Sequence, residues 1–283
     1  MRKFRKNFNE YFKLISIKIN YMDFIIKLMS KKNFTFLRKL ILHFSLKISG
    51  YKNYGNFYKT GEEQVIELIK RNNIKNCLDI GAHVGEFSKK LLEIKNMNVI
   101  AFEPMKKTFL ELKKIETKYK KNFKCFNIAL SNKSGKSEIF YTNPLSQLSS
   151  ITINLNRINF LKNKKIKKQK ILTDTLDKFS IKKKNFFNKK IDFIKIDTEG
   201  HDLKVLIGAT KFILLHKPKF IQIEMNYHYL FSGENLFQFS KQLKSYDIYQ
   251  IMPYNNGLIK INPTRPENNI FHLSNFLFIK RKK

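Results

Sequence analysis

The 283-residue sequence has no tryptophan, two cysteines and only seven arginines among its 56 basic residues. Arginine is the side chain best suited to bidentate contacts with phosphates and bases. Its scarcity argues against reading the net charge of +34 simply as a nucleic-acid-binding surface. Lysine, asparagine, isoleucine and phenylalanine are abundant instead, as in proteins encoded by AT-rich genes. We attribute most of the charge to compositional drift on solvated surfaces, and the alternative is contact with an anionic membrane or a polyanionic substrate.

The sequence also lacks the features of exported and membrane-spanning chains. Cys77 and Cys125 both lie in apolar, strand-like runs, which predicts buried thiols rather than a disulfide and is typical of a reducing compartment. No apolar run approaches the roughly 18 residues needed to cross a bilayer. The basic N-terminus has no small-residue cleavage site of a secretory signal. We therefore predict a cytoplasmic protein.

Residues 1–58 are predicted to form a basic amphipathic helical extension. Apolar residues recur there at helical spacing among lysines and arginines: Phe4, Phe8, Tyr11, Phe12, Ile15 and Ile19, then Phe36, Leu37, Leu40, Ile41 and Phe44. Helices of this kind can lie on an anionic membrane, here as a peripheral contact at the inner face. The alternative is that they pack on the main domain or on a second subunit.

Residues 59–283 alternate between helical and strand-like patterns and are predicted to form one domain. Five apolar runs, separated by amphipathic helices, predict parallel strands over residues 76–81, 99–104, 123–130, 191–197 and 219–226, and two final strands follow over 246–254 and 275–280. Alternating βα units predict an α/β fold with a doubly wound, mostly parallel seven-stranded sheet and an antiparallel pair at its edge. The lysine-rich stretch 162–170 is predicted to be an exposed loop.

The first predicted strand leads into a glycine-containing loop. Asp79 ends the strand, and Gly81 and Gly85 follow, but His83 stands near the place where a dinucleotide fingerprint would have its second glycine. A cofactor without phosphates, carrying an amino-acid carboxylate and amine, needs less room there. Glu103 ends the second strand, where it can accept hydrogen bonds from both hydroxyls of a ribose. S-adenosylmethionine fits this set better than a nicotinamide dinucleotide.

The third predicted strand ends near two further candidates for the cofactor site. Asn127 and Ala129 are expected near the adenine. The alternative is that they are ordinary residues at the end of a strand.

Five segments carry a resemblance to a known family: LDIGAHVGEF, AFEP, NIALSNKSGK, TDTLDKF and KIDTEGHDLKVLIGA. In this order they resemble the FkbM family of S-adenosylmethionine-dependent methyltransferases over roughly residues 60–280. The family commonly has Asn at the position of His83 and a further acidic residue near Asp202. The resemblance implies a class I methyltransferase, Rossmann-like fold and methyl transfer, usually to oxygen on sugars, polyketides or other small metabolites.

The turn after the fourth predicted strand supplies the candidate catalytic residues. Asp197 ends the strand, where ligands of open α/β sheets bind, and Glu199 and His201 follow it. A hydroxyl acceptor needs a positioned base, and these three side chains can serve. The alternatives are a helix-capping role for Glu199 and a supporting role for His201.

Other polar residues are candidates for contact with the acceptor. Glu224 and Asn226 end the fifth strand, and with Asp197 they offer the oxygen ligands that Mg²⁺ prefers. Ser149 and Ser150 lie in a polar segment, 141–160, which is expected to close over the acceptor or to form an ordinary surface hairpin.

The leading hypothesis is therefore a methyltransferase acting on a hydroxyl of a sugar, a glycan or another small metabolite. One alternative is an RNA methyltransferase, although no RNA-binding module and no N/D-P-P-Y motif are present. Another is a catalytically inactive, membrane-associated binding protein with the same fold.

Overall fold

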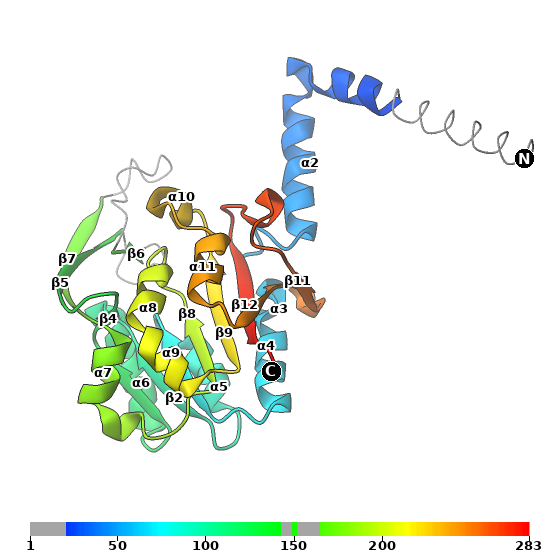
Figure 1. The fold of residues 1–283 in the computed structure, drawn as a ribbon. Helices are drawn as coiled ribbons and strands as arrows, with labels where there is room; N and C mark the ends of the chain where they lie inside the picture. Colours follow the sequence, from blue (N-terminus) through cyan, green and yellow to red (C-terminus); the bar gives the residue numbers. More distant parts are fainter. Residues whose placement is uncertain (1–20, 143–148, 152–164, 283) are drawn as a thin grey trace, which may run out of the picture. The chain divides into compact units, whose positions relative to one another are not determined.

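The computed structural model describes residues 21–142, 149–151 and 165–282 (Figure 1). The chain divides into two compact units, Met1–Ser49 and Gly50–Lys283. The division falls nine residues before the predicted boundary after residue 58. Residues 50–58 belong with the second unit because Lys52 N donates to Leu273 O at 2.8 Å and Ser274 Oγ donates to Gly50 O at 3.0 Å.

In its described part, the first unit is helical. Residues 21–29 form a helix, a 3-10 turn η1 (Lys32–Phe34) follows, and α2 spans Thr35–Ile48. The Arg38 guanidinium stabilises the turn by donating to Lys31 O at 2.8 Å and to Thr35 Oγ1 at 3.2 Å. The predicted helix over Phe36–Phe44 is present, whereas the pattern from Phe4 to Ile19 lies outside the described residues. Among the described helices, none combines the length and apolar character that a membrane span requires.

The second unit holds the helices and strands of the predicted α/β domain. The helices are α3 (Phe57–Thr60), α4 (Glu62–Arg71), α5 (Glu86–Leu92), α6 (Lys106–Lys118), α7 (Leu176–Lys182), α8 (Asp202–Gly208), α9 (Thr210–His216), α10 (His228–Ser232) and α11 (Leu236–Gln242), with 3-10 turns η4 (Lys184–Phe186), η5 (Pro253–Asn255) and η6 (Pro266–Asn268). The strands are β1 (Asn76–Ile80), β2 (Asn98–Phe102), β3 (Phe123–Phe126), β4 (Ala129–Leu130), β5 (Gly135–Tyr141), β6 (Ser149–Ser150), β7 (Lys167–Asp174), β8 (Phe193–Ile196), β9 (Phe220–Met225), β10 (Tyr246–Ile251), β11 (Leu258–Lys260) and β12 (Ser274–Lys280).

The main sheet confirms the predicted fold class. Its order is β11-β10-β12-β9-β8-β1-β2-β3, with the five strands from β9 to β3 parallel and the remainder antiparallel. It has eight strands rather than seven because the short edge strand β11 pairs with β10. That strand was missed because its three residues are too few for a periodic pattern.

Side-chain alternation along the parallel strands gives the sheet two apolar faces. One face packs α4, α5 and α6 through Ile69, Leu91 and Leu112, which share a buried cluster with Cys77 and other residues of the strands. On the other face, Phe102 of β2 contacts Phe179 of α7 at a ring distance of 5.3 Å. Helices on both faces fix the strands, so that their carboxyl ends meet at one edge.

A second, four-stranded sheet has the order β4-β7-β5-β6. Its strand β7 corrects the prediction of an exposed loop over 162–170, because the strand begins at Lys167, while 162–164 lie outside the described residues. Exposed lysines hide the alternation that buries Ile171 against Ile139 of β5. Segment 141–160 is described only at 141–142 and 149–151.

We predict that Gly208→Ala lowers the free energy of unfolding by about 3 kcal/mol, because overpacking against rigid backbone is costly. A Cβ at Gly208 would lie 1.9 Å from Ser131 O, where α8 touches the end of β4. Denaturant unfolding measures the effect. The control Gly233→Ala has nothing within 4 Å of its new Cβ and should cost only about 1 kcal/mol of left-handed strain. Equal losses in the two variants would contradict the close-packing argument.

Candidate active site

A cavity of about 540 Å³ opens at the carboxyl ends of β1, β2, β8 and β9. Nine residues predicted from the sequence line it: Asp79, Gly81, His83, Glu103, Ala129, Asp197, Glu199, Glu224 and Asn226. Gly85, Asn127 and His201 do not line it. Ser149 and Ser150 form β6 beside β5, and Ile139 of β5 and the following Ile151 belong to the cavity wall.

The loop after β1 passes very close to the end of β8. Gly81 has a φ of +85°, and a Cβ there would lie 1.9 Å from Asp197 O. Its N–H donates to Phe102 O at 2.9 Å. Gly85 begins α5 with a φ of +81°, and a Cβ there would lie 2.4 Å from Ile115 Cδ1. Both glycines are therefore required by backbone conformation and by space, and Gly85 acts through packing rather than by contact with a ligand.

Asp79 presents a buried acceptor atom to the cavity. The residue is 1% exposed, and its Oδ2 accepts from Ser88 Oγ at 2.6 Å. Its Oδ1 has no hydrogen-bond partner among the described residues. Burial raises the pKa of Asp79, and the nearby Lys195 ammonium partly opposes that rise. A buried acceptor left without a donor is costly, so this atom fits the ammonium group of an amino-acid moiety.

Glu103 is held firmly at the end of β2. Its Oε1 accepts from Met105 N at 2.8 Å and from Thr108 Oγ1 at 2.9 Å, and its Oε2 accepts from His83 N at 2.9 Å. A carboxylate has about four acceptor positions, so roughly one is left for a ribose hydroxyl rather than the two that the sequence suggested. Burial raises the pKa of Glu103 to about 7 despite these hydrogen bonds.

Of the two residues predicted near the adenine, only Ala129 lines the cavity, together with Ile128 and Leu130. Asn127 is exposed and donates through Nδ2 to Glu103 O at 2.8 Å and Pro104 O at 3.0 Å. It therefore fixes the end of β2 instead of facing the cavity.

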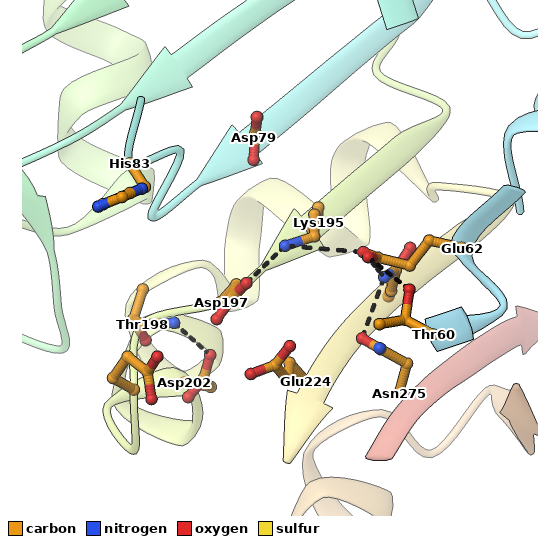
Figure 2. Close-up of polar contacts among 12 residues, drawn as sticks. Thr60, Glu62, Asp79, His83, Lys195, Asp197, Thr198, Asp202, Glu224 and Asn275 are labelled. Atoms are coloured by element: carbon orange, nitrogen blue, oxygen red, sulfur yellow. Dashed lines mark hydrogen bonds and ion pairs between the residues drawn. The ribbon is translucent and has the colours of Figure 1, made fainter. Parts of the chain in front are cut away.

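The other side of the cavity centres on a buried ion pair (Figure 2). Lys195 Nζ lies 2.6 Å from Asp197 Oδ2 and 4.0 Å from Glu62 Oε1. Lys195 lies in β8 and Asp197 directly follows its end, so these side chains, two residues apart along an extended backbone, point the same way. Although burial alone would lower the pKa of Lys195, the carboxylates of Asp197 and Glu62 raise it above its usual value. The ammonium therefore stays charged and balances Asp197.

Glu62 belongs to a buried hydrogen-bond network. Gln222 Nε2 donates to Glu62 Oε1 at 2.9 Å and to Asn275 Oδ1 at 3.2 Å, and Thr60 Oγ1 donates to Glu62 Oε2 at 3.1 Å (Figure 2). The network joins α4, β9 and β12 to Lys195 and thus to the cavity.

Two further carboxyls face Asp197. Glu199 has a φ of +54°, a strained conformation for this residue type. Its Oε2 accepts from Asn226 Nδ2 at 2.7 Å and lies 2.8 Å from His228 Nδ1. Burial and the charge of Asp197 raise the pKa of both Glu199 and Glu224 well above the usual range. The raised pKa values favour the protonated form of both side chains beside the Lys195–Asp197 ion pair.

The residues predicted as Mg²⁺ ligands are partly engaged within the protein. Oxygens of Asp197, Glu199 and Glu224 lie within 4.8 Å of one another. However, Asp197 pairs with Lys195, and Asn226 donates to Glu199 while its Oδ1 accepts from His228 N at 2.9 Å. The predicted set with Asn226 as a ligand does not fit this arrangement, and we assign no step to a metal.

His201 is corrected as a candidate base. It is 3% exposed, lies outside the cavity lining, and its Nε2 is 2.9 Å from Ser131 Oγ. Burial lowers its pKa to about 4. Asp202 Oδ1 closes the turn before α8 by accepting from Thr198 N at 2.9 Å. No side chain, that of Glu199 included, donates or accepts a capping hydrogen bond at the start of this helix.

Sequence reasoning missed several residues of the cavity. Lys195, Glu62, Tyr54 and Tyr227 all line it. The K-I-D spacing contained a signal for Lys195, since residues two apart on a strand share a face. Tyr54 and Glu62 carry no comparable local signal.

Comparison of the sequence with models of known protein families identifies one family. The family model described as Methyltransferase FkbM domain matches residues 79–250. No curated protein matches the chain.

Solved structures with similar folds include three methyltransferases at low identity. A protein provisionally described as an RNA methyltransferase from Pyrococcus horikoshii has 14% identity and a TM-score of 0.38, covering 86% of this chain and 98% of the other. One provisionally described as a caffeoyl-CoA O-methyltransferase from Staphylococcus aureus has 12% identity and a TM-score of 0.41, covering 92% of this chain and 98% of the other. A Streptococcus mutans protein provisionally described as a methyltransferase, in complex with SAH, has 10% identity and a TM-score of 0.42, covering 78% of this chain and 98% of the other. These scores do not distinguish between acceptors.

We predict that S-adenosylmethionine binds more tightly as pH rises from 6 to 8, by about tenfold for a single linked proton. The pKa of Glu103 is about 7, and a ribose hydroxyl donates to its ionised form, so binding must release the proton. Isothermal calorimetry across this range measures the effect, and Glu103→Gln should remove the pH dependence.

Glu234 provides a matched control. Burial raises its pKa to about 7 as well, but it lies outside the cavity. Glu234→Gln should keep the pH dependence of the wild type. A wild-type affinity that is flat with pH would remove Glu103 from the cofactor site.

Proposed function

Because this chain belongs to the FkbM methyltransferase family, we propose that it methylates a hydroxyl group of a sugar, a glycan or another small metabolite. S-adenosylmethionine, the methyl donor of the family, supplies an electrophilic methyl group when bound. The proposal concerns the acceptor and the residues that act on it. One observation carries it: the ion pair of Lys195 and Asp197 lies in the same cavity as Asp79 and Glu103.

The cofactor side is assigned to the ends of β1 and β2. Asp79 Oδ1, the atom without a donor, would bind the amino group of the donor molecule. Glu103 would accept a hydrogen bond from a ribose hydroxyl. Gly81, which has no Cβ, lets the loop after β1 pass close to Asp197 O at the end of β8. Ile128, Ala129 and Leu130 offer an apolar wall, which suits an adenine ring.

The acceptor side is assigned to the ends of β8 and β9. Asp197 would accept the proton of the acceptor hydroxyl, and the Lys195 ammonium would hold the Asp197 carboxyl group in position. Glu199 and Glu224, as neutral acids, can both donate and accept hydrogen bonds. Orientation of the acceptor and proton removal together account for much of the catalysis in such a transfer.

The polar wall favours an acceptor with several hydroxyls. Tyr54 and Tyr227 line the cavity beside Glu199 and Glu224. Burial, together with nearby carboxyls, raises the pKa of both phenols, so they stay neutral donors. Aromatic rings and paired hydrogen-bonding groups are suited to a sugar ring, whereas an RNA phosphate would meet Asp197 and Glu62.

Transfer of labelled methyl groups tests the acceptor class. Purified protein is incubated with labelled S-adenosylmethionine and, separately, with a panel of sugars and glycans and with total RNA. Label in the sugar fraction supports the proposal, whereas label in RNA alone would replace it with the RNA methyltransferase alternative.

We also place the reaction in the cytoplasm, since Cys77 and Cys125 are both free, buried thiols.

We predict that Asp197→Asn lowers turnover at least 100-fold, the usual size of general-base catalysis, while S-adenosylmethionine still binds. Lys195→Met should lower turnover as well, because Asp197 then loses the ammonium 2.6 Å away that orients its carboxyl group. The measurement is initial rate against pH.

The control is Lys190→Met, which removes an ion pair with Asp192 at 2.8 Å outside the cavity. Its profile should match that of the wild type. If Asp197→Asn kept near-normal turnover, another base would have to be found.

We predict that EDTA changes turnover by less than twofold. The Lys195 ammonium already balances Asp197, and protein donors occupy Asn226 and Glu199. Activity assayed after chelation and then with added Mg²⁺ measures this. A loss in EDTA that Mg²⁺ restores would assign Asp197, Glu199 and Glu224 as metal ligands instead.

A further inference from the structure

The helix α2 carries an apolar face that is exposed among residues 21–49, the described part of its own unit. The face consists of positions linked by spacings of three or four residues, which share one side of a helix. Its members and exposed fractions are Phe36 80%, Leu37 39%, Leu40 53%, Ile41 50%, Phe44 64% and Ile48 60%. A contiguous stripe of six large apolar side chains marks an interaction surface rather than an ordinary soluble face.

The preceding helix extends this apolar character. In residues 21–29, the side chains of Tyr21, Met22, Phe24 and Ile26 are each more than half exposed. The turn to α2 is held by the Arg38 guanidinium. Both helices therefore expose apolar side chains, and hydrogen bonds stabilise the turn that joins them.

The charge of the same segment identifies the partner. Residues 21–48 hold six basic residues against one acidic residue, Asp23: the basic ones are Lys27, Lys31, Lys32, Arg38, Lys39 and Lys47. A second copy of the chain would bring the same positive charges together, which opposes association. An RNA would match the charge but leave the apolar face in water. An anionic lipid surface satisfies both, because apolar groups enter the acyl boundary while lysines contact the headgroups.

We propose that the apolar face of α2 docks onto an anionic phospholipid bilayer and holds the protein at the membrane surface. The contact is interfacial, as expected for a 14-residue helix, which is too short to span the hydrocarbon layer. This inference does not depend on which hydroxyl the enzyme methylates.

Flotation of the full-length protein with vesicles tests the proposal. Vesicles of phosphatidylcholine alone are compared with vesicles containing 30% phosphatidylglycerol, at low salt and at 0.5 M salt. We expect the protein to float only with the anionic vesicles and less so at high salt, since salt screens the attraction. No flotation, or equal flotation with both vesicle types, would overturn the proposal.

Matched triple variants identify the surface. Phe36→Gln/Leu40→Gln/Phe44→Gln should lower the bound fraction at least tenfold. The control Ile181→Gln/Leu214→Gln/Leu215→Gln removes three exposed apolar residues of α7 and α9 and should bind like the wild type. Undiminished flotation of the first variant would show that another surface binds.

Two further readouts separate other outcomes. Calorimetric S-adenosylmethionine binding in each variant shows that the cavity-bearing unit is folded, and if the wild type itself binds none, thermal unfolding serves instead. Sedimentation reports the oligomeric state. A wild-type dimer that the α2 variant converts to a monomer, without vesicle binding, would make a second copy the occupant and refute the membrane contact.

Discussion

The buried ammonium of Lys195 is the charge on which the active-site end of this sheet depends. Parallel strands bring their carboxyl ends to one edge, and here those ends hold Asp79, Asp197 and Glu224 around a cavity. Ionised carboxylates gathered in a poorly solvated site repel one another and lose hydration. Lys195 offsets this at 2.6 Å from Asp197, and the remaining acids respond by holding protons, as the raised pKa values of Glu199 and Glu224 indicate.

This balance divides the carboxyls by role. A carboxyl paired with an ammonium, beside acids whose pKa values are raised, is the kind of arrangement by which one fold separates a base from hydrogen-bond donors. The close approach of Gly81 to Asp197 O places the loop after β1 directly against the same turn. The position of Asp197 and that of the loop after β1 are thus tied together by one close backbone approach between the ends of β1 and β8.

The sequence predicted the parts of the site that follow from topology. Asp79, Glu103, Asp197 and Glu224 were identified because residues at the ends of parallel strands must share an edge. His201 was misjudged because sequence proximity does not give side-chain direction, and the structure directs its imidazole to Ser131. The second sheet was missed because lysines on the exposed side of β7 obscured its period. Contacts between distant segments, such as Gln222 with Glu62, have no local pattern at all.

The segment matched by the family model supplies only part of the cavity. It begins at residue 79 and ends at 250, so it contains Asp79, Glu103 and Asp197. Tyr54 and Glu62 precede it, and Leu273 and the Asn275 that hydrogen-bonds Gln222 follow it. These flanking residues meet because β12 inserts next to β9 in the sheet, while α4 packs on one face of that sheet. The segment matched by the family model therefore forms one side of the cavity, and parts of the chain outside that segment complete its wall near Lys195 and Glu224.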